Sequence, residues 1–185
     1  MDIKEKIEFA KLTFQNVQDM ISFADGKANI TLTLQTVFLG IGLGASLLTD
    51  KTESLKNFDN AIVITYFILT ILFIATSLIG IILSINVYRA RPPVVYSEFN
   101  RLGLIYFGHI VKFVKPDDYF IKINSMDDEV ALKELTQQVY TLSYIAQMKM
   151  DFVNKAIFLL IINVLLVSIL ILISGYINII IGDIS

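Results

Sequence analysis

The chain has 185 residues, of which 55% are hydrophobic and 17% are charged, and it carries a formal net charge of −2 at pH 7. It contains no cysteine and a single histidine, which excludes a disulfide framework, a thiolate nucleophile and a thiolate metal site. Three long uncharged runs indicate an integral membrane protein, and the segments between them are too short for a large independent core.

Residues 1–27 are predicted to form a cytosolic amphipathic helix. Their apolar residues recur in steps of three and four, which is the spacing of a packed helical seam. The alternative is a helix that lies on the membrane surface. We favour a bundle helix, because the seam is narrow and the segment is slightly negative, unlike lysine-rich surface helices. This charged stretch precedes the first apolar run, so no cleavable signal peptide is predicted.

Residues 28–48 are predicted to be the first transmembrane helix. These 21 residues carry no charge and would extend about 31 Å as a helix, close to the roughly 30 Å hydrocarbon layer. Polar side chains crowd half of the run and need protein partners or water. The seam of residues 1–27, continued into this run, meets polar residues, which suggests a central axis shared by several subunits. The predicted pore-lining residues are Thr31, Gln35, Phe38 and Gly42, with Phe38 as an apolar gate.

Two further apolar runs follow. The charge pattern assigns the topology, because four of the 15 lysines and arginines precede the first run and nine lie between the second and third. The positive-inside rule therefore places the N-terminus in the cytoplasm. We predict an external loop at 49–60, a second transmembrane helix at 61–87, a cytosolic helical sensor region at 88–155, a third transmembrane helix at 156–181 and an external tail at 182–185.

The predicted fold is an all-α membrane protein with three transmembrane helices and a cytosolic helical bundle. A long helix is predicted to begin at Asp127 or Asp128 and to continue unbroken into the third span, because its apolar positions also step by threes and fours. Three spans are too few to enclose a pore in one subunit. We therefore expect a homo-oligomer of at least three copies and favour a tetramer.

The cytosolic region offers side chains suited to a nucleotide. A helix side that carries tyrosines and a lysine can stack on and hydrogen-bond a nucleobase, or it can be the solvated flank of a helix. Arginines upstream offer guanidinium groups that match phosphate, although two of them lie where topology alone places positive charge. The candidate ligand-binding residues are Arg89, Arg91, Arg101, Tyr140, Tyr144 and Lys149.

No catalytic residue, metal or cofactor is predicted. The sequence contains no glycine-rich phosphate loop, nucleophile elbow or pair of catalytic carboxylates. We interpret His109 as a packed, hydrogen-bonded histidine in preference to a general base. An enzyme is therefore the least favoured class.

Three blocks of sequence resemble a known family. They are residues 24–28 with Asp25 and Lys27, residues 106–110 with Gly108 and His109, and residues 138–149. Their order and spacing along nearly the whole chain are similar to those of the Pycsar-effector transmembrane family (PycTM-like). A related arrangement is that of the HalB channels of Hailong antiphage systems, in which a short deoxyadenylate strand holds the channel shut.

The resemblance implies a multi-pass effector of the bacterial inner (plasma) membrane that acts against phage. It also implies a nucleotide or short oligonucleotide ligand made by an associated nucleotidyltransferase or cyclase. The leading hypothesis is an oligomeric ion channel or pore that such a ligand opens or closes through the cytosolic bundle, so that inner-membrane integrity is lost. The alternative is a non-conducting membrane anchor or adaptor that recruits a cytosolic partner.

Overall fold

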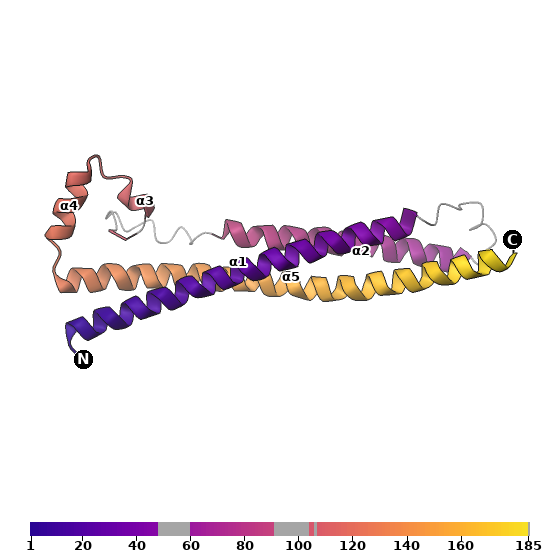
Figure 1. Ribbon diagram of the computed structural model, residues 1–185, viewed down its shortest axis with the longest axis horizontal. Coiled ribbons are helices and arrows are strands. Elements are labelled where there is room, and N and C mark those ends of the chain that lie inside the picture. Colours follow the sequence, from indigo (N-terminus) through magenta and orange to yellow (C-terminus); the bar gives the residue numbers. More distant parts are fainter. Residues whose placement is uncertain (48–59, 91–103, 106, 185) are drawn as a thin grey trace. The chain divides into compact units, whose positions relative to one another are not determined.

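The computed structural model describes residues 1–47, 60–90, 104–105 and 107–184 (Figure 1). Every regular element in these residues is a helix, which confirms the all-α prediction for this part of the chain. Most of the predicted loop at 49–60, together with Arg91 and Arg101, lies outside the described residues. In chain order the helices are α1 (Ile3–Leu47), α2 (Asn60–Arg89), α3 (Phe107–Ile110), α4 (Pro116–Asn124) and α5 (Asp128–Ile184).

The start of α5 follows from its sequence. The carboxylate of Asp127 accepts a hydrogen bond from the backbone N–H of Val130 at 2.8 Å, which is the geometry of a helix N-cap. Asp128 and Glu129 then place negative charge in the first turn, where the helix dipole favours it. The helix continues for 57 residues without interruption, as the sequence predicts.

The other long helix, α1, is also continuous. Its 45 residues join the predicted cytosolic helix and the predicted first span in a single element. Gly26 lies inside the helix and does not interrupt it. Both α1 and α5 therefore contain a predicted cytosolic part and a predicted membrane part.

The chain divides into two compact units. Unit 1 comprises residues 1–24 and 89–150, and unit 2 comprises residues 25–88 and 151–185. These divisions fall near residues 28, 88 and 156, where the sequence predicts the inner membrane boundary. The boundaries themselves stay predictions.

Unit 2 buries several polar side chains beside its apolar core and exposes many large apolar side chains. Its buried polar residues are Thr31, Gln35, Ser77, Ser84, Asn163 and Ser174. Large apolar side chains on α2 and α5 are exposed, among them Phe67, Ile71, Ile79, Phe158, Leu165 and Leu172. This distribution suits a hydrocarbon solvent, in which polar groups need protein partners and apolar groups do not need burial.

Two helices in the described part of the chain are long and apolar enough to cross a membrane. They are the segments Ala61–Arg89 of α2 and Asp128–Tyr176 of α5, judged by length and composition. The predicted span in α1 is not one of them. A total of three transmembrane helices therefore stays a prediction.

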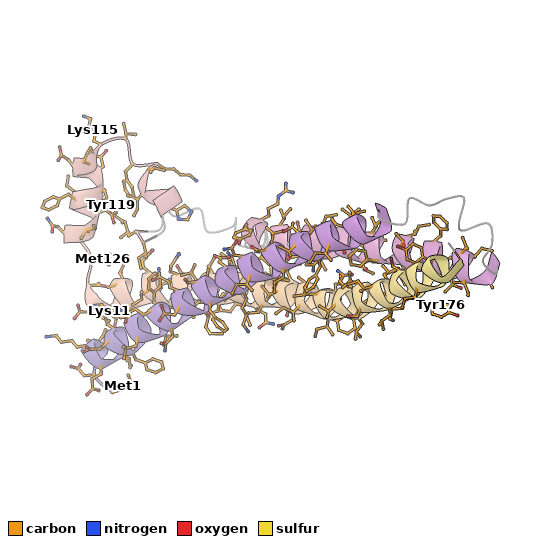
Figure 2. All side chains as sticks on the ribbon, turned by 45° about the vertical axis from the view of Figure 1, so that its right-hand side comes forward. Met1, Lys11, Lys115, Tyr119, Met126 and Tyr176 are labelled. Carbon is orange, nitrogen blue, oxygen red and sulfur yellow. The ribbon has the colours of Figure 1, made fainter. Side chains whose placement is uncertain are left out.

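In unit 1, the buried residue Leu104 contacts two helices. Leu104 is buried, and its N–H donates to the carboxylate of Glu134 on α5 at 3.1 Å. Its carbonyl accepts the hydroxyl of Tyr119 at 2.9 Å, and Tyr119 is labelled on α4 in Figure 2. The ring of Phe113 packs 5.3 Å from that of Tyr119, centroid to centroid. These contacts attach the α3–α4 region to α5.

Candidate functional site

The centre of unit 2 contains a polar residue from the first predicted span. Gln35 on α1 is completely buried, and its side-chain Nε2 donates to the backbone carbonyl of Ala156 on α5 at 3.1 Å. An amide in this setting needs such partners, because an unpaired polar group in hydrocarbon is costly. The hydrogen bond therefore fixes α1 against α5.

A second buried amide, Asn163, extends this contact to α2. The Oδ1 atom of Asn163 accepts the hydroxyl of Thr76 at 2.6 Å, and its Nδ2 lies 3.5 Å from the Oε1 of Gln35. We call Gln35, Thr76 and Asn163, with the carbonyl of Ala156, the amide network. Each hydrogen bond between membrane helices contributes about 0.6–2 kcal/mol. The amide network therefore joins all three helices of unit 2.

Space for the amide network comes from a glycine on α2. Gly80 is buried, and a Cβ atom added to it would overlap the side-chain amide of Gln35. Only glycine leaves room for the amide in its observed position. A larger residue at position 80 would displace the flexible end of the Gln35 side chain.

A second glycine contact lies further along α1. Gly42 is buried, and an added Cβ atom would overlap the ring of Phe73 on α2. Phe73 belongs to the apolar core cluster of unit 2, which also contains Tyr66, Leu166, Val167 and Leu170. The missing side chain at Gly42 thus allows α1 and α2 to approach closely.

Ser77 differs from the other buried polar residues. Among the described residues, its hydroxyl is the one buried side-chain oxygen or nitrogen with no hydrogen-bond partner. Ser84, two turns further along α2, instead donates its hydroxyl to the carbonyl of Gly80 at 3.0 Å.

We expect Ser77→Ala to leave the thermal stability unchanged or to raise it. Removing an unsatisfied buried hydroxyl relieves a desolvation penalty of about 1–3 kcal/mol. Ser84→Ala is the matched control, because it removes a hydroxyl that has an acceptor. Thermal melting in detergent, followed by circular dichroism, compares the two. A larger loss of stability in Ser77→Ala than in Ser84→Ala would contradict this account.

The four predicted pore-lining residues all lie on the side of α1 that packs inside unit 2. The hydroxyl of Thr31 is buried and donates to the carbonyl of Lys27 at 2.8 Å. Phe38 is half-buried and packs against the core cluster, while Gln35 and Gly42 make the contacts above. The sequence predicts that the polar residues Thr31 and Gln35 need protein or water as hydrogen-bond partners. In the structure their partners are protein groups. Their role as pore lining stays a prediction.

The predicted ligand residues do not form one surface. Tyr140 and Tyr144 are 60% and 42% exposed and lie one turn apart on the same side of α5. Lys149 is buried and lies nine residues from Tyr140, which is two and a half turns and therefore the opposite side of the helix. Arg89 is exposed at the end of α2. Arg91 and Arg101 lie outside the described residues.

Among the residues of the resemblance, Asp25 takes part in a contact between two helices. The backbone carbonyl of Asp25 accepts the hydroxyl of Tyr88 at 3.4 Å, which joins α1 to the end of α2. Lys27 is half-buried, and Gly108 and His109 are half-buried within α3. In the part of the chain that the structure describes, no three histidine or carboxylate side chains could together hold a metal ion.

Sequence reasoning missed the pairing of Gln35 with Asn163 and the role of Gly80. A signal for the pairing was present. Gln35 and Asn163 each lie seven residues beyond the predicted inner ends of their spans, at residues 28 and 156. Equal depth, about 10 Å at the helical rise, is what two amides that share a membrane layer require.

Comparison with known proteins agrees with the resemblance found in the sequence. The sequence profile of the PycTM family, described as the Pycsar effector protein domain, matches residues 9–175. A curated relative, the Pycsar effector protein TpPycTM of Treponema porcinum, is 35% identical over 107 residues, which cover 57% of this chain and 84% of the relative. No solved structure matches the chain. The chain therefore belongs to the PycTM family of Pycsar effectors, membrane proteins of antiphage defence.

Proposed function

We propose that this effector assembles into an oligomeric channel or pore in the inner membrane, with its N-terminus in the cytoplasm, and that a nucleotide bound to its cytosolic part gates it. Family membership points to a cyclic nucleotide from an associated cyclase; a short oligonucleotide from a nucleotidyltransferase is the broader alternative. The observation that carries the proposal is the pair of buried amides in unit 2, Gln35 and Asn163, because buried amides within membrane helices are costly and commonly functional.

The continuous helices supply a route from ligand to membrane. Both α1 and α5 contribute residues to unit 1 and to unit 2 without a break. A rigid helix that two sites share can transmit a small shift, provided that the ligand binds one arrangement of the helices better than the other. Enzymatic activity is not part of this proposal.

One observation favours the alternative function, a non-conducting membrane anchor or adaptor. The exposed threonines Thr33, Thr36 and Thr65 each donate their hydroxyls to backbone carbonyls of their own helix. They therefore do not need water, and an exposed threonine by itself does not mark a pore. The buried amides of Gln35 and Asn163 would also join the helices of a simple tether. Their cost within membrane helices is the feature that favours a functional role.

Native mass spectrometry of the full chain in detergent tests the assembly and the ligand together. The probe is a panel of the four 3′,5′-cyclic ribonucleotides. We expect an oligomer of at least three subunits, a tetramer by preference, that retains one of these nucleotides. A monomer that retains none of them would contradict the proposal.

The ligand site we propose contains the exposed tyrosines of α5, with the arginines Arg89, Arg91 and Arg101 as candidates for phosphate. Lys149, which is buried on the opposite side of α5, is not included in it. Tyr140→Ala and Tyr144→Ala should each weaken binding of the retained nucleotide about tenfold or more, because stacking of one base on an aromatic ring contributes about 1–3 kcal/mol. Isothermal titration calorimetry measures the change. Phe120→Ala is the control, since Phe120 is also an exposed aromatic residue and lies on α4 of the same unit. Unchanged affinity in both tyrosine variants would remove them from the site.

A further inference from the structure

The amide network holds the most polar side chain of the predicted pore face inside the subunit. Gln35 is fully buried, with its Nε2 bonded to the carbonyl of Ala156 and its Oε1 facing Asn163. A side chain in this position cannot line a water-filled path. A conducting state that uses the face of Gln35 must therefore break these contacts first.

We infer that the amide network keeps the proposed pore closed by holding Gln35 inside the subunit, in the space left by Gly80, until the nucleotide signal breaks these hydrogen bonds. We call this arrangement the catch, and the pore the conduit. This inference rests on the proposed function. Two features of the network suit a catch better than a permanent joint. The contact between the amides of Asn163 and Gln35 is long, at 3.5 Å. Ser77, the residue after Thr76 on α2, has a buried hydroxyl with no partner, so the polar groups near the network are not all satisfied.

The exchange that opens the catch conserves hydrogen bonding. In the closed arrangement, Gln35 and Asn163 are satisfied by Ala156, by Thr76 and by each other. In an open arrangement, water in the conduit replaces these partners, so no polar group is stranded in hydrocarbon. The two states then differ by a small number of hydrogen bonds, a difference that a ligand can offset.

Gly80→Ala is the direct test, because its methyl group would displace the amide of Gln35. The full-length protein is reconstituted in vesicles of phosphatidylethanolamine and phosphatidylglycerol, and potassium efflux is recorded without nucleotide. We expect the basal efflux of Gly80→Ala to rise about tenfold, since losing one or two such hydrogen bonds changes an equilibrium by that factor. Gly40→Ala on α1 is the matched control, because nothing lies within 4 Å of its added Cβ atom.

Thr76→Val provides a variant that keeps the packing volume. It removes only the hydroxyl that donates to Asn163 at 2.6 Å, so folding should be preserved even if Gly80→Ala assembles poorly. We expect its basal efflux to rise as well, with normal assembly by size-exclusion chromatography. The inference is overturned if assembled Gly80→Ala and Thr76→Val show the same potassium efflux as the parent without nucleotide and the same increase in efflux when nucleotide is added.

A cysteine accessibility assay measures whether water enters the interior of unit 2. The chain has no cysteine, so Ser77→Cys introduces a single thiol at a fully buried position. We expect this thiol to be protected from a charged methanethiosulfonate reagent in the Ser77→Cys protein and to be modified when Gly80→Ala is added. Continued protection despite increased efflux would place the leak elsewhere and overturn the catch.

These results separate the catch from the proposed function. Suppose that the parent conducts when one of the four 3′,5′-cyclic ribonucleotides is added, while Gly80→Ala and Thr76→Val show no increased efflux without it. The inferred catch is then wrong, and the proposed channel is unaffected. If neither the parent nor any variant conducts with any of these nucleotides, the channel is wrong, and the catch falls with it.

Discussion

Gly42→Ala is expected to destabilise the membrane unit by about 1–3 kcal/mol, as overpacking of a tight contact does. The added methyl group would overlap the ring of Phe73, a fully buried residue in the core cluster. Unlike the amide at Gly80, this neighbour is a rigid ring enclosed by other side chains, so it cannot move aside cheaply. Thermal melting in detergent, followed by circular dichroism, measures the loss.

Gly40→Ala is the matched control for this prediction. It lies two residues away on the same helix, with nothing within 4 Å of an added Cβ atom. Alanine is favoured over glycine within a helix by about 1 kcal/mol, so Gly40→Ala should be neutral or stabilising. Equal melting temperatures for the two variants would show that Gly42 does not pack on Phe73 as described.

Phe38→Ala is expected to raise the potassium efflux of vesicles without nucleotide, but to a level below that of the nucleotide-opened parent, because the amide network of Gln35 stays intact. Phe38 packs against the core cluster of unit 2 and is the apolar gate of the proposed conduit. Removing its ring takes away the constriction that excludes water and ions. The measurement is potassium efflux from vesicles that contain the purified variant.

The control for the gate is Ile41→Ala, which shortens an exposed apolar side chain on the same helix. It should leave the basal efflux at the parent level. The proposed gate is wrong if assembled Phe38→Ala shows the same potassium efflux without nucleotide as the parent. The Gly80→Ala result then decides whether the face of α1 that carries Gln35 takes part at all.

The two long helices could be predicted from local sequence. Apolar seams with steps of three and four run through both, and Asp127 and Asp128 supply the cap and first-turn charge of α5. Gly26 does not break α1, because one glycine costs a helix only about 1 kcal/mol and contacts along the rest of the helix outweigh it. Helix continuity is therefore a property that periodicity and capping reveal.

The side-chain contacts of unit 2 could not be predicted in the same way. The sequence shows that Gln35 needs a partner, and equal depth makes Asn163 a candidate. It does not show whether the partner is water, a second subunit or Asn163 of the same chain. Gly80 gives no local signal, since its role depends on how α2 is rotated toward α1. The same limit applies to Lys149, which is near the exposed tyrosines in sequence but lies on the opposite side of α5.

Planar-bilayer recording of the purified full-length protein tests the central claim most directly, with and without each of the four 3′,5′-cyclic ribonucleotides. The account predicts discrete conductance steps whose open probability one of these nucleotides changes, and steps that occur without nucleotide in Gly80→Ala. An assembled, membrane-inserted protein with no conductance in any of these conditions would contradict it and would favour the non-conducting anchor.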